Sequence, residues 1–233
     1  MQRLLPYITA LFTATFVLAP LVTAPFTGYE ADQIPVFMDQ PPIQPAGYAF
    51  SIWGLIYSWL VLSAVYGLIK RRYDGAWQIT RGPLALSLAL GTLWLAIANA
   101  TVIWATVIIV IMAGLAILAL LRSPFKDRWW LKVPVGLYAG WLTAASCVSF
   151  AIMIAGYDIM SYQAASILFL IIAMIAAIAI KLMPPSGIAY GAAVIWALVG
   201  VIMQNSTDNL VMSVLSVIGI LAIAAVIIRR DFA

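Results

Sequence analysis

Histidine is absent from this sequence, cysteine occurs once, and charged side chains make up only 9% of the residues. Without histidine, a Ser-His-Asp triad, a haem with a proximal histidine and a Cys/His zinc site are all excluded. The single cysteine, Cys147, cannot form a disulfide within the chain, and its apolar surroundings predict an ordinary buried core position. These absences exclude the common forms of nucleophilic, metal and redox chemistry.

Apolar residues dominate what remains, at 65% of the chain compared with roughly 45–50% in a soluble domain. A membrane-crossing helix needs about 20 mostly apolar residues. Apolar runs of about this length occupy residues 4–26, 47–69, 83–99, 101–121, 133–155, 162–182, 187–203 and 210–228. The sequence therefore predicts an all-α polytopic membrane protein with eight transmembrane helices, no large soluble domain and the lipid bilayer as its main partner.

Two of these apolar runs have ambiguous boundaries. Residues 83–121 are too long for one crossing, so we predict a tight turn near Asn99. The first run resembles a signal peptide because Arg3 precedes it, but Pro25 directly follows the candidate cleavage point. We therefore expect residues 4–26 to form the first membrane helix.

Basic residues test the helix count, because lysine and arginine accumulate in short cytoplasmic loops. With a cytoplasmic N-terminus, all 12 basic residues fall on the cytoplasmic side: Arg3, Lys70, Arg71, Arg72, Arg81, Arg122, Lys126, Arg128, Lys132, Lys181, Arg229 and Arg230. The opposite loops carry only acids: Glu30, Asp32, Asp39, Asp158 and Asp208. We predict cytoplasmic N- and C-termini and no ionisable side chain in the middle of a span. A proton or sodium relay and a nucleic-acid partner are therefore not expected.

Aromatic residues occur both near the predicted membrane surfaces and inside the helices. Trp129 and Trp130 beside Arg128, and Trp77 beside Arg81, are typical of an interfacial aromatic belt. The connection at 27–46 contains four prolines and three acids, which favours either a stiff linker or a lid over an opening between helices.

The spacing of the interior aromatic residues groups them by helix face. Trp53 and Tyr57 are four residues apart, Tyr138 and Trp141 are three apart, and Ala145 and Ser149 continue the second stripe. One interpretation is plain helix packing, for which Gly136, Gly140 and Ala144 provide small residues at four-residue spacing. The other is a pocket for a planar lipophilic ligand with polar edges, because flat rings can wall a cavity and donate hydrogen bonds at its rim. Its predicted lining is Trp53, Tyr57, Trp94, Tyr138, Trp141, Ala145 and Ser149.

Three motifs in order resemble the TspO/MBR family of tryptophan-rich sensory proteins, which includes translocator-protein-like members. They are the run from Pro45 to Tyr57 with its Trp-x-x-x-Tyr ending, the pair Leu93-Trp94, and Tyr138-x-x-Trp141 followed by Ala145. The resemblance covers roughly residues 1–155. Departures occur at Gly47, where the family has Trp, and at Gly91 and Ser149, where it has Asn.

The resemblance implies a five-helix bundle over residues 1–155, and residues 156–233 then form a three-helix C-terminal extension, as in a longer bacterial branch. It implies a bacterial inner-membrane protein that binds porphyrin, haem or another planar lipophilic molecule non-covalently. Because histidine is absent, we expect stacking and edge hydrogen bonds to hold a porphyrin, with ligation by Tyr or Met left open. A lipid is the other expected non-covalent ligand.

Several functions stay open at this point. The first is a sensory or regulatory receptor or carrier without enzymatic activity. The second is an accessory or assembly subunit of a larger membrane complex. It would use small residues of the last three helices, either Gly187, Gly191 and Gly200 or Ala176, Ala177 and Ala179. A facilitative small-molecule transporter is the third, and a homodimer is compatible with the first. No acid, base or metal constellation in the spans supports catalysis.

Overall fold

The described residues of the computed structural model, 3–24, 26, 28–206 and 208–231, form eight α-helices and one short 3-10 helix. The α-helices are α1 (Leu5–Val22), α2 (Ile52–Lys70), α3 (Gly75–Ala98), α4 (Val102–Arg122), α5 (Lys132–Gly156), α6 (Tyr162–Leu182), α7 (Ile188–Asn205) and α8 (Leu210–Asp231), and the 3-10 helix is η1 (Gly47–Ser51). All eight α-helices are long and apolar enough to cross a membrane, which confirms the predicted fold class. The turn between α3 and α4 contains Asn99, as predicted.

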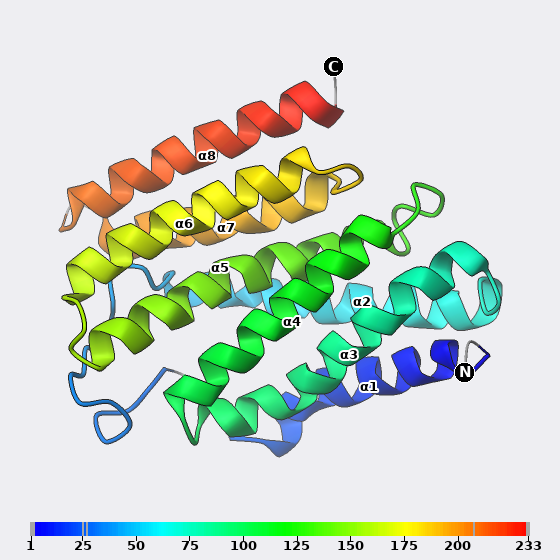
Figure 1. The fold of residues 1–233 in the computed structure, drawn as a ribbon, viewed down its shortest axis with the longest axis horizontal. Coiled ribbons are helices and arrows are strands. Elements are labelled where there is room, and N and C mark those ends of the chain that lie inside the picture. The colour runs from blue at the N-terminus through cyan, green and yellow to red at the C-terminus, as the bar shows by residue number, and fades with distance from the viewer. Residues whose placement is uncertain (1–2, 25, 27, 207, 232–233) are drawn as a thin grey trace.

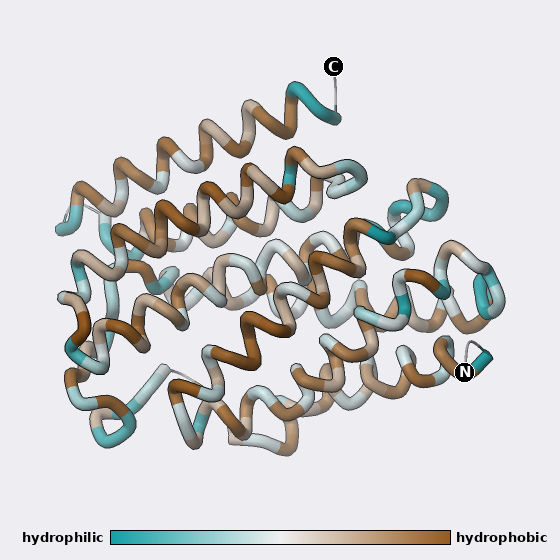
Figure 2. The backbone as a smooth tube through the Cα atoms, in the orientation of Figure 1, coloured by the Kyte–Doolittle hydropathy of each residue, from teal (hydrophilic) through white to brown (hydrophobic). Residues whose placement is uncertain are grey.

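The helices lie side by side along the long axis of the molecule, with α1 and α3 at one side and α8 at the other (Figure 1). Helix α5 lies between α4 and the pair α6 and α7. Hydrophilic residues concentrate at the two ends of the bundle (Figure 2). We call the right-hand end in Figure 1, where α5 and α7 begin and α8 ends, the basic end, and the opposite end the acidic end.

Small residues set the contact between α5 and α7. A Cβ atom added to Gly140 would overlap the carbonyl oxygen of Tyr190 and lie 2.9 Å from the Cβ of Ala193. An added Cβ at Gly136 would lie 3.2 Å from the backbone nitrogen of Tyr190. The predicted helix-packing role of both glycines is therefore confirmed, and the partner is a helix of the C-terminal part.

Helix α3 begins at Gly75, eight residues before the predicted apolar run, because Asp74 caps its N-terminus. The Asp74 carboxylate accepts hydrogen bonds from the backbone nitrogens of Ala76 and Trp77. Arg81 consequently lies in the first two turns of α3 and is only 3% exposed, so its predicted place in a loop before this helix is wrong. Its guanidinium donates to carbonyl oxygens at the end of α2, those of Gly67, Arg71 and Arg72.

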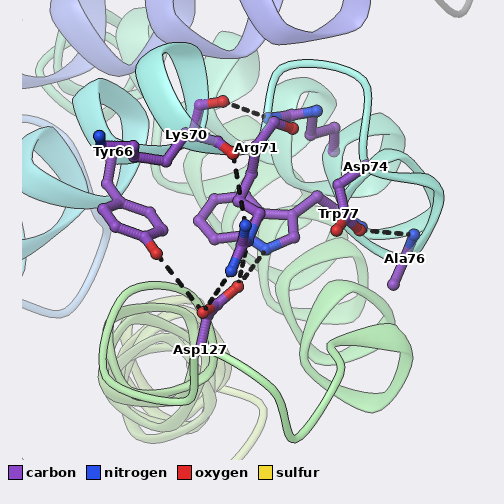
Figure 3. A network of polar contacts seen from close by, with 9 residues as sticks. Tyr66, Lys70, Arg71, Asp74, Ala76, Trp77 and Asp127 are labelled. Atoms are coloured by element: carbon purple, nitrogen blue, oxygen red, sulfur yellow. Dashed lines mark hydrogen bonds and ion pairs between the residues drawn. The ribbon is translucent and has the colours of Figure 1, made fainter.

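A polar network at the basic end joins the α2–α3 turn to the α4–α5 connection (Figure 3). Asp127 accepts hydrogen bonds from Arg71 Nε at 2.6 Å, Arg71 Nη2 at 3.1 Å and Trp77 Nε1 at 3.3 Å. These bonds from Arg71, together with that from Trp77, hold the pKa of the Asp127 carboxyl below its ordinary value.

The same network corrects the predicted aromatic belt. Trp77 is 3% exposed because its ring packs inside the bundle and its indole nitrogen is bonded to Asp127, so its assignment to the belt is wrong. Trp129 and Trp130 are exposed, and their rings stack on Trp59 and Tyr66 of α2.

Candidate functional site

Aromatic rings from three helices meet inside the bundle. Helix α2 contributes Trp53 and Tyr57, whose stacked ring centroids are 5.2 Å apart, and α5 contributes Tyr138 and Trp141. The Trp53 ring lies 6.3 Å from Trp141 and 6.4 Å from Tyr138. Phe16 of α1 packs edge to face on Trp53, Tyr57 and Tyr138. We call these five residues the aromatic cluster.

The cluster is more deeply buried on its α5 side than on its α2 side. Tyr138 is fully buried, and its hydroxyl shares a hydrogen bond of 3.0 Å with that of Ser87. Trp141 is buried as well, whereas Trp53 and Tyr57 are half-buried. The side of the cluster formed by α2 is therefore the side on which another molecule can reach the rings.

Phe16 is the member of the cluster that the sequence reasoning missed. Its signal was present, because Thr9, Thr13 and Phe16 recur at helical spacing and form the buried face of α1. Gly91 of α3 provides the space for the ring, since a Cβ atom there would lie 2.6 Å from Phe16 Cε2. The resemblance to the TspO/MBR family places Asn at this position. The absence of a side chain at Gly91 is therefore what lets the Phe16 ring lie here.

The remaining predicted site residues lie closer to the acidic end. Trp94 packs against Phe26 at 5.5 Å between centroids, and its indole nitrogen donates to the carbonyl oxygen of Ala105 at 2.9 Å. Ala145 is one turn and Ser149 two turns beyond Trp141, roughly 6 and 12 Å further along α5. The structure thus brings four of the predicted residues together, and the other three lie one or more helical turns further toward the acidic end.

The proline-rich connection returns into the bundle alongside α7. The backbone nitrogen of Ala46 donates to the carbonyl oxygen of Gly200 at 3.0 Å, and Trp196 Nε1 donates to that of Ala49 at 2.8 Å. Asn205 Nδ2 donates to the carbonyl oxygen of Pro42 at 2.7 Å. We call residues 42–51 the η1 segment. It is held by the C-terminal part of the chain and carries Phe50, whose ring packs edge to face on Trp141.

A polar pocket of about 620 Å³ lies at the acidic end, between the first part of the same connection, the α3–α4 turn and the end of α5. Its lining comprises Ala24, Gly28, Glu30, Asp32, Gln33, Asn99, Ala100, Thr101 and Tyr157. Gln33 donates to the carbonyl oxygen of Asn99 at 2.8 Å, which connects the first part of the proline-rich connection to the α3–α4 turn. The tyrosine hydroxyl of Tyr162 donates to the carbonyl oxygen of Val36 at 2.7 Å and connects it to α6.

A second cavity lies between α1, α2 and α3, toward the basic end from the aromatic cluster. Its volume is about 20 Å³, which is room for about one water molecule. Thr9, Thr13, Ser63 and Arg81 contribute polar groups to its lining.

Comparison with known protein families gives one match. The model of the family described as TSPO-like protein matches residues 4–229. The match includes the last three helices and so extends well beyond the residues 1–155 on which the motif resemblance rests. No curated protein and no solved structure matches the chain.

Proposed function

The chain belongs to the TSPO-like protein family, and on that premise we propose that it is a membrane receptor or carrier for a planar lipophilic ligand of the tetrapyrrole type. The observation that carries this proposal is the meeting of indole and phenol rings from α1, α2 and α5 at one place. Flat aromatic faces stack on a porphyrin, while indole N–H and phenol O–H groups bond its polar edge. The role is sensory or regulatory and does not include catalysis.

Ligand access is from the α2 side. Trp53 and Tyr57 are half-buried, whereas Tyr138 and Trp141 are held in the interior. The rings of α2 and α5 contact one another, so the Trp53 and Tyr57 side chains must separate from α5 to admit a ligand between them. Tyr138 stays in place because its hydroxyl is bonded to Ser87, and it provides the fixed wall.

The proposed location is the bacterial inner membrane, with both termini in the cytoplasm. The basic end carries the α2–α3, α4–α5 and α6–α7 connections as well as the described C-terminal residues, and positively charged loops remain on the cytoplasmic side.

Two glycines of α7 favour the receptor over an accessory subunit. An added Cβ at Gly191 would lie 2.7 Å from Ile227 Cδ1 of α8, and one at Gly200 would lie 2.7 Å from Pro45 Cβ. These glycines therefore form contacts within the chain and do not provide a free surface for another subunit. Sizing in mild detergent separates the two functions, since a receptor migrates as a monomer or dimer and a subunit co-migrates with a larger complex.

Direct binding of protoporphyrin IX tests the receptor proposal. We expect a shift of the pigment's own absorption band on titration with the purified protein. We also expect about a fivefold weaker affinity for Trp53→Leu, because one stacked ring contributes on the order of 1 kcal/mol. Trp104→Leu is the matched control, since Trp104 is 62% exposed on α4 and outside the cluster. Unchanged affinity of Trp53→Leu, or no band shift at high micromolar pigment, contradicts the proposal.

A further inference from the structure

Lys132 is a buried cation, and no described residue forms a hydrogen bond or an ion pair with its ammonium group. It is the first residue of α5 and is only 4% exposed. The ring of Phe125 lies against the ammonium, with its centroid 3.7 Å from Nζ. Removing an ammonium group from water is unfavourable unless an anion or acceptor compensates it, so this position favours an acidic ligand.

Two helix N-termini add positive potential at the same place. Helices α5 and α7 both begin at the basic end and run parallel in contact, so the positive ends of their dipoles are adjacent. Neither N-cap residue, Leu131 or Gly187, makes a side-chain capping hydrogen bond. The aliphatic part of Lys132 lies against the start of α7, because its Cδ atom is 3.3 Å from the position of a Cβ atom added to Gly187.

The carboxylates of the basic end have other partners. Asp127 binds Arg71, and Asp74 caps α3. Asp231 pairs with Lys181 at 2.6 Å, which compensates the other buried lysine of this end. Within the described residues, therefore, no carboxylate forms an ion pair with Lys132.

We propose that Lys132 and the first turn of α7 form a binding site for a phosphate oxyanion, supplied by the headgroup of an anionic phospholipid. The Lys132 ammonium donates to the phosphate oxygens, and backbone N–H groups of the α7 first turn, which have no intrahelical acceptor, donate alongside it. Phe125 is 71% exposed, so its ring can turn away from Nζ without disturbing the core. A lipid is the fitting source because the site lies at the ends of membrane-spanning helices, and the exposed Trp129 and Trp130 precede Lys132 closely in the sequence.

Lipid retention measured by native mass spectrometry tests this site independently of any porphyrin. The full chain is released from detergent containing equal amounts of phosphatidylglycerol and phosphatidylcholine. We expect the wild type to retain phosphatidylglycerol in preference to phosphatidylcholine. Lys132→Met should reduce this preference at least about tenfold. Lys132→Arg should keep it, because arginine preserves the charge. Lys126→Met is the matched control, since it removes one exposed cation from the same connection and should change retention less than about twofold.

A second arm replaces the lipid with inorganic phosphate, observed by phosphorus NMR line broadening. Broadening in the wild type that disappears in Lys132→Met supports the oxyanion site with a soluble source, and retention of phosphatidylglycerol alone supports the lipid source. Equal lipid retention by wild type and Lys132→Met, with no Lys132-dependent broadening, overturns the proposal. Unfolding midpoints of Lys132→Met and Lys126→Met close to that of the wild type show that the fold of these variants is intact.

Discussion

Asp127 illustrates how a single side chain can hold several parts of this chain together. It lies in the α4–α5 connection and binds Arg71 after α2 and Trp77 within α3. Its side chain is 12% exposed, so water competes only partly for the carboxylate. A charge-assisted pair with two N–H donors from one guanidinium is the strong form of this interaction.

Replacing Asp127 with Asn should therefore lower the midpoint of thermal unfolding by about 2–4 °C, the shift expected for one strong polar interaction in a chain of this size. The control is Asp39→Asn, because Asp39 is exposed in the connection at the acidic end. Equal midpoints for both variants, measured in the same detergent, would show that the network contributes no stability.

The pH dependence of the same pair has a defined sign. The pKa of Asp127 is lowered in the folded chain, chiefly by hydrogen bonding to Arg71. The stabilisation is thus complete above the unfolded pKa and decreases as pH falls below about 4. In acid titrations followed by circular dichroism, wild type should lose stability over this range more steeply than Asp127→Asn. Parallel titration curves would contradict the assignment.

At the scale of elements, the contact between α5 and α7 depends on the absence of a side chain at Gly140. An added methyl group would overlap the carbonyl oxygen of Tyr190, which is backbone and can move only with α7. Gly114 of α4, by contrast, has nothing within 4 Å of an added Cβ atom.

Gly140→Ala should accordingly destabilise the chain by about 1–3 kcal/mol, whereas Gly114→Ala should be neutral or stabilising by up to about 1 kcal/mol because alanine favours helix. Thermal unfolding in detergent measures both. If Gly140→Ala is as stable as Gly114→Ala, the close contact of α5 with α7 is incorrect.

The η1 segment is the second element whose position depends on the C-terminal part. A Cβ atom at Gly200 would lie 2.7 Å from Pro45 Cβ and 2.8 Å from Ala49 Cβ, so Gly200→Ala must push the segment away from α7. The displacement breaks the hydrogen bond from the Ala46 nitrogen to the Gly200 carbonyl.

Hydrogen exchange should reveal this displacement. We expect amide exchange of residues 46–51 to become at least about tenfold faster in Gly200→Ala, corresponding to roughly 1.4 kcal/mol less protection. Exchange in Gly114→Ala should match the wild type, and an unchanged rate in Gly200→Ala would show that α7 does not position the η1 segment.

For the whole molecule, the sequence was sufficient for the number of helices and for the α3–α4 turn, because both follow from apolar run lengths. It was insufficient for the start of α3. The first turns of α3 are too polar to form part of an apolar run, so hydropathy places the start of the helix at residue 83 and Arg81 in a loop. The Asp74 cap makes these turns helical.

The candidate site was predicted in part for a similar reason. Spacing within α2 and α5 correctly paired Trp53 with Tyr57 and Tyr138 with Trp141, since it fixes the face of each helix. Spacing does not fix the axial offset between helices, so it could not show that Trp94 lies toward the acidic end or that Phe16 fills the space beside Gly91. The position of the η1 segment on α7 depends on contacts between residues more than 140 positions apart, such as Trp196 with Ala49. The division of the chain near residue 155 stays a prediction.

An experimental structure of the chain with bound protoporphyrin IX tests the proposed function most directly. The account predicts pigment density between the rings of α2 and α5, with Trp53 and Tyr57 moved away from Trp141 and with the Tyr138–Ser87 hydrogen bond intact. Pigment found only elsewhere, with the five rings of the aromatic cluster still in mutual contact, would contradict it.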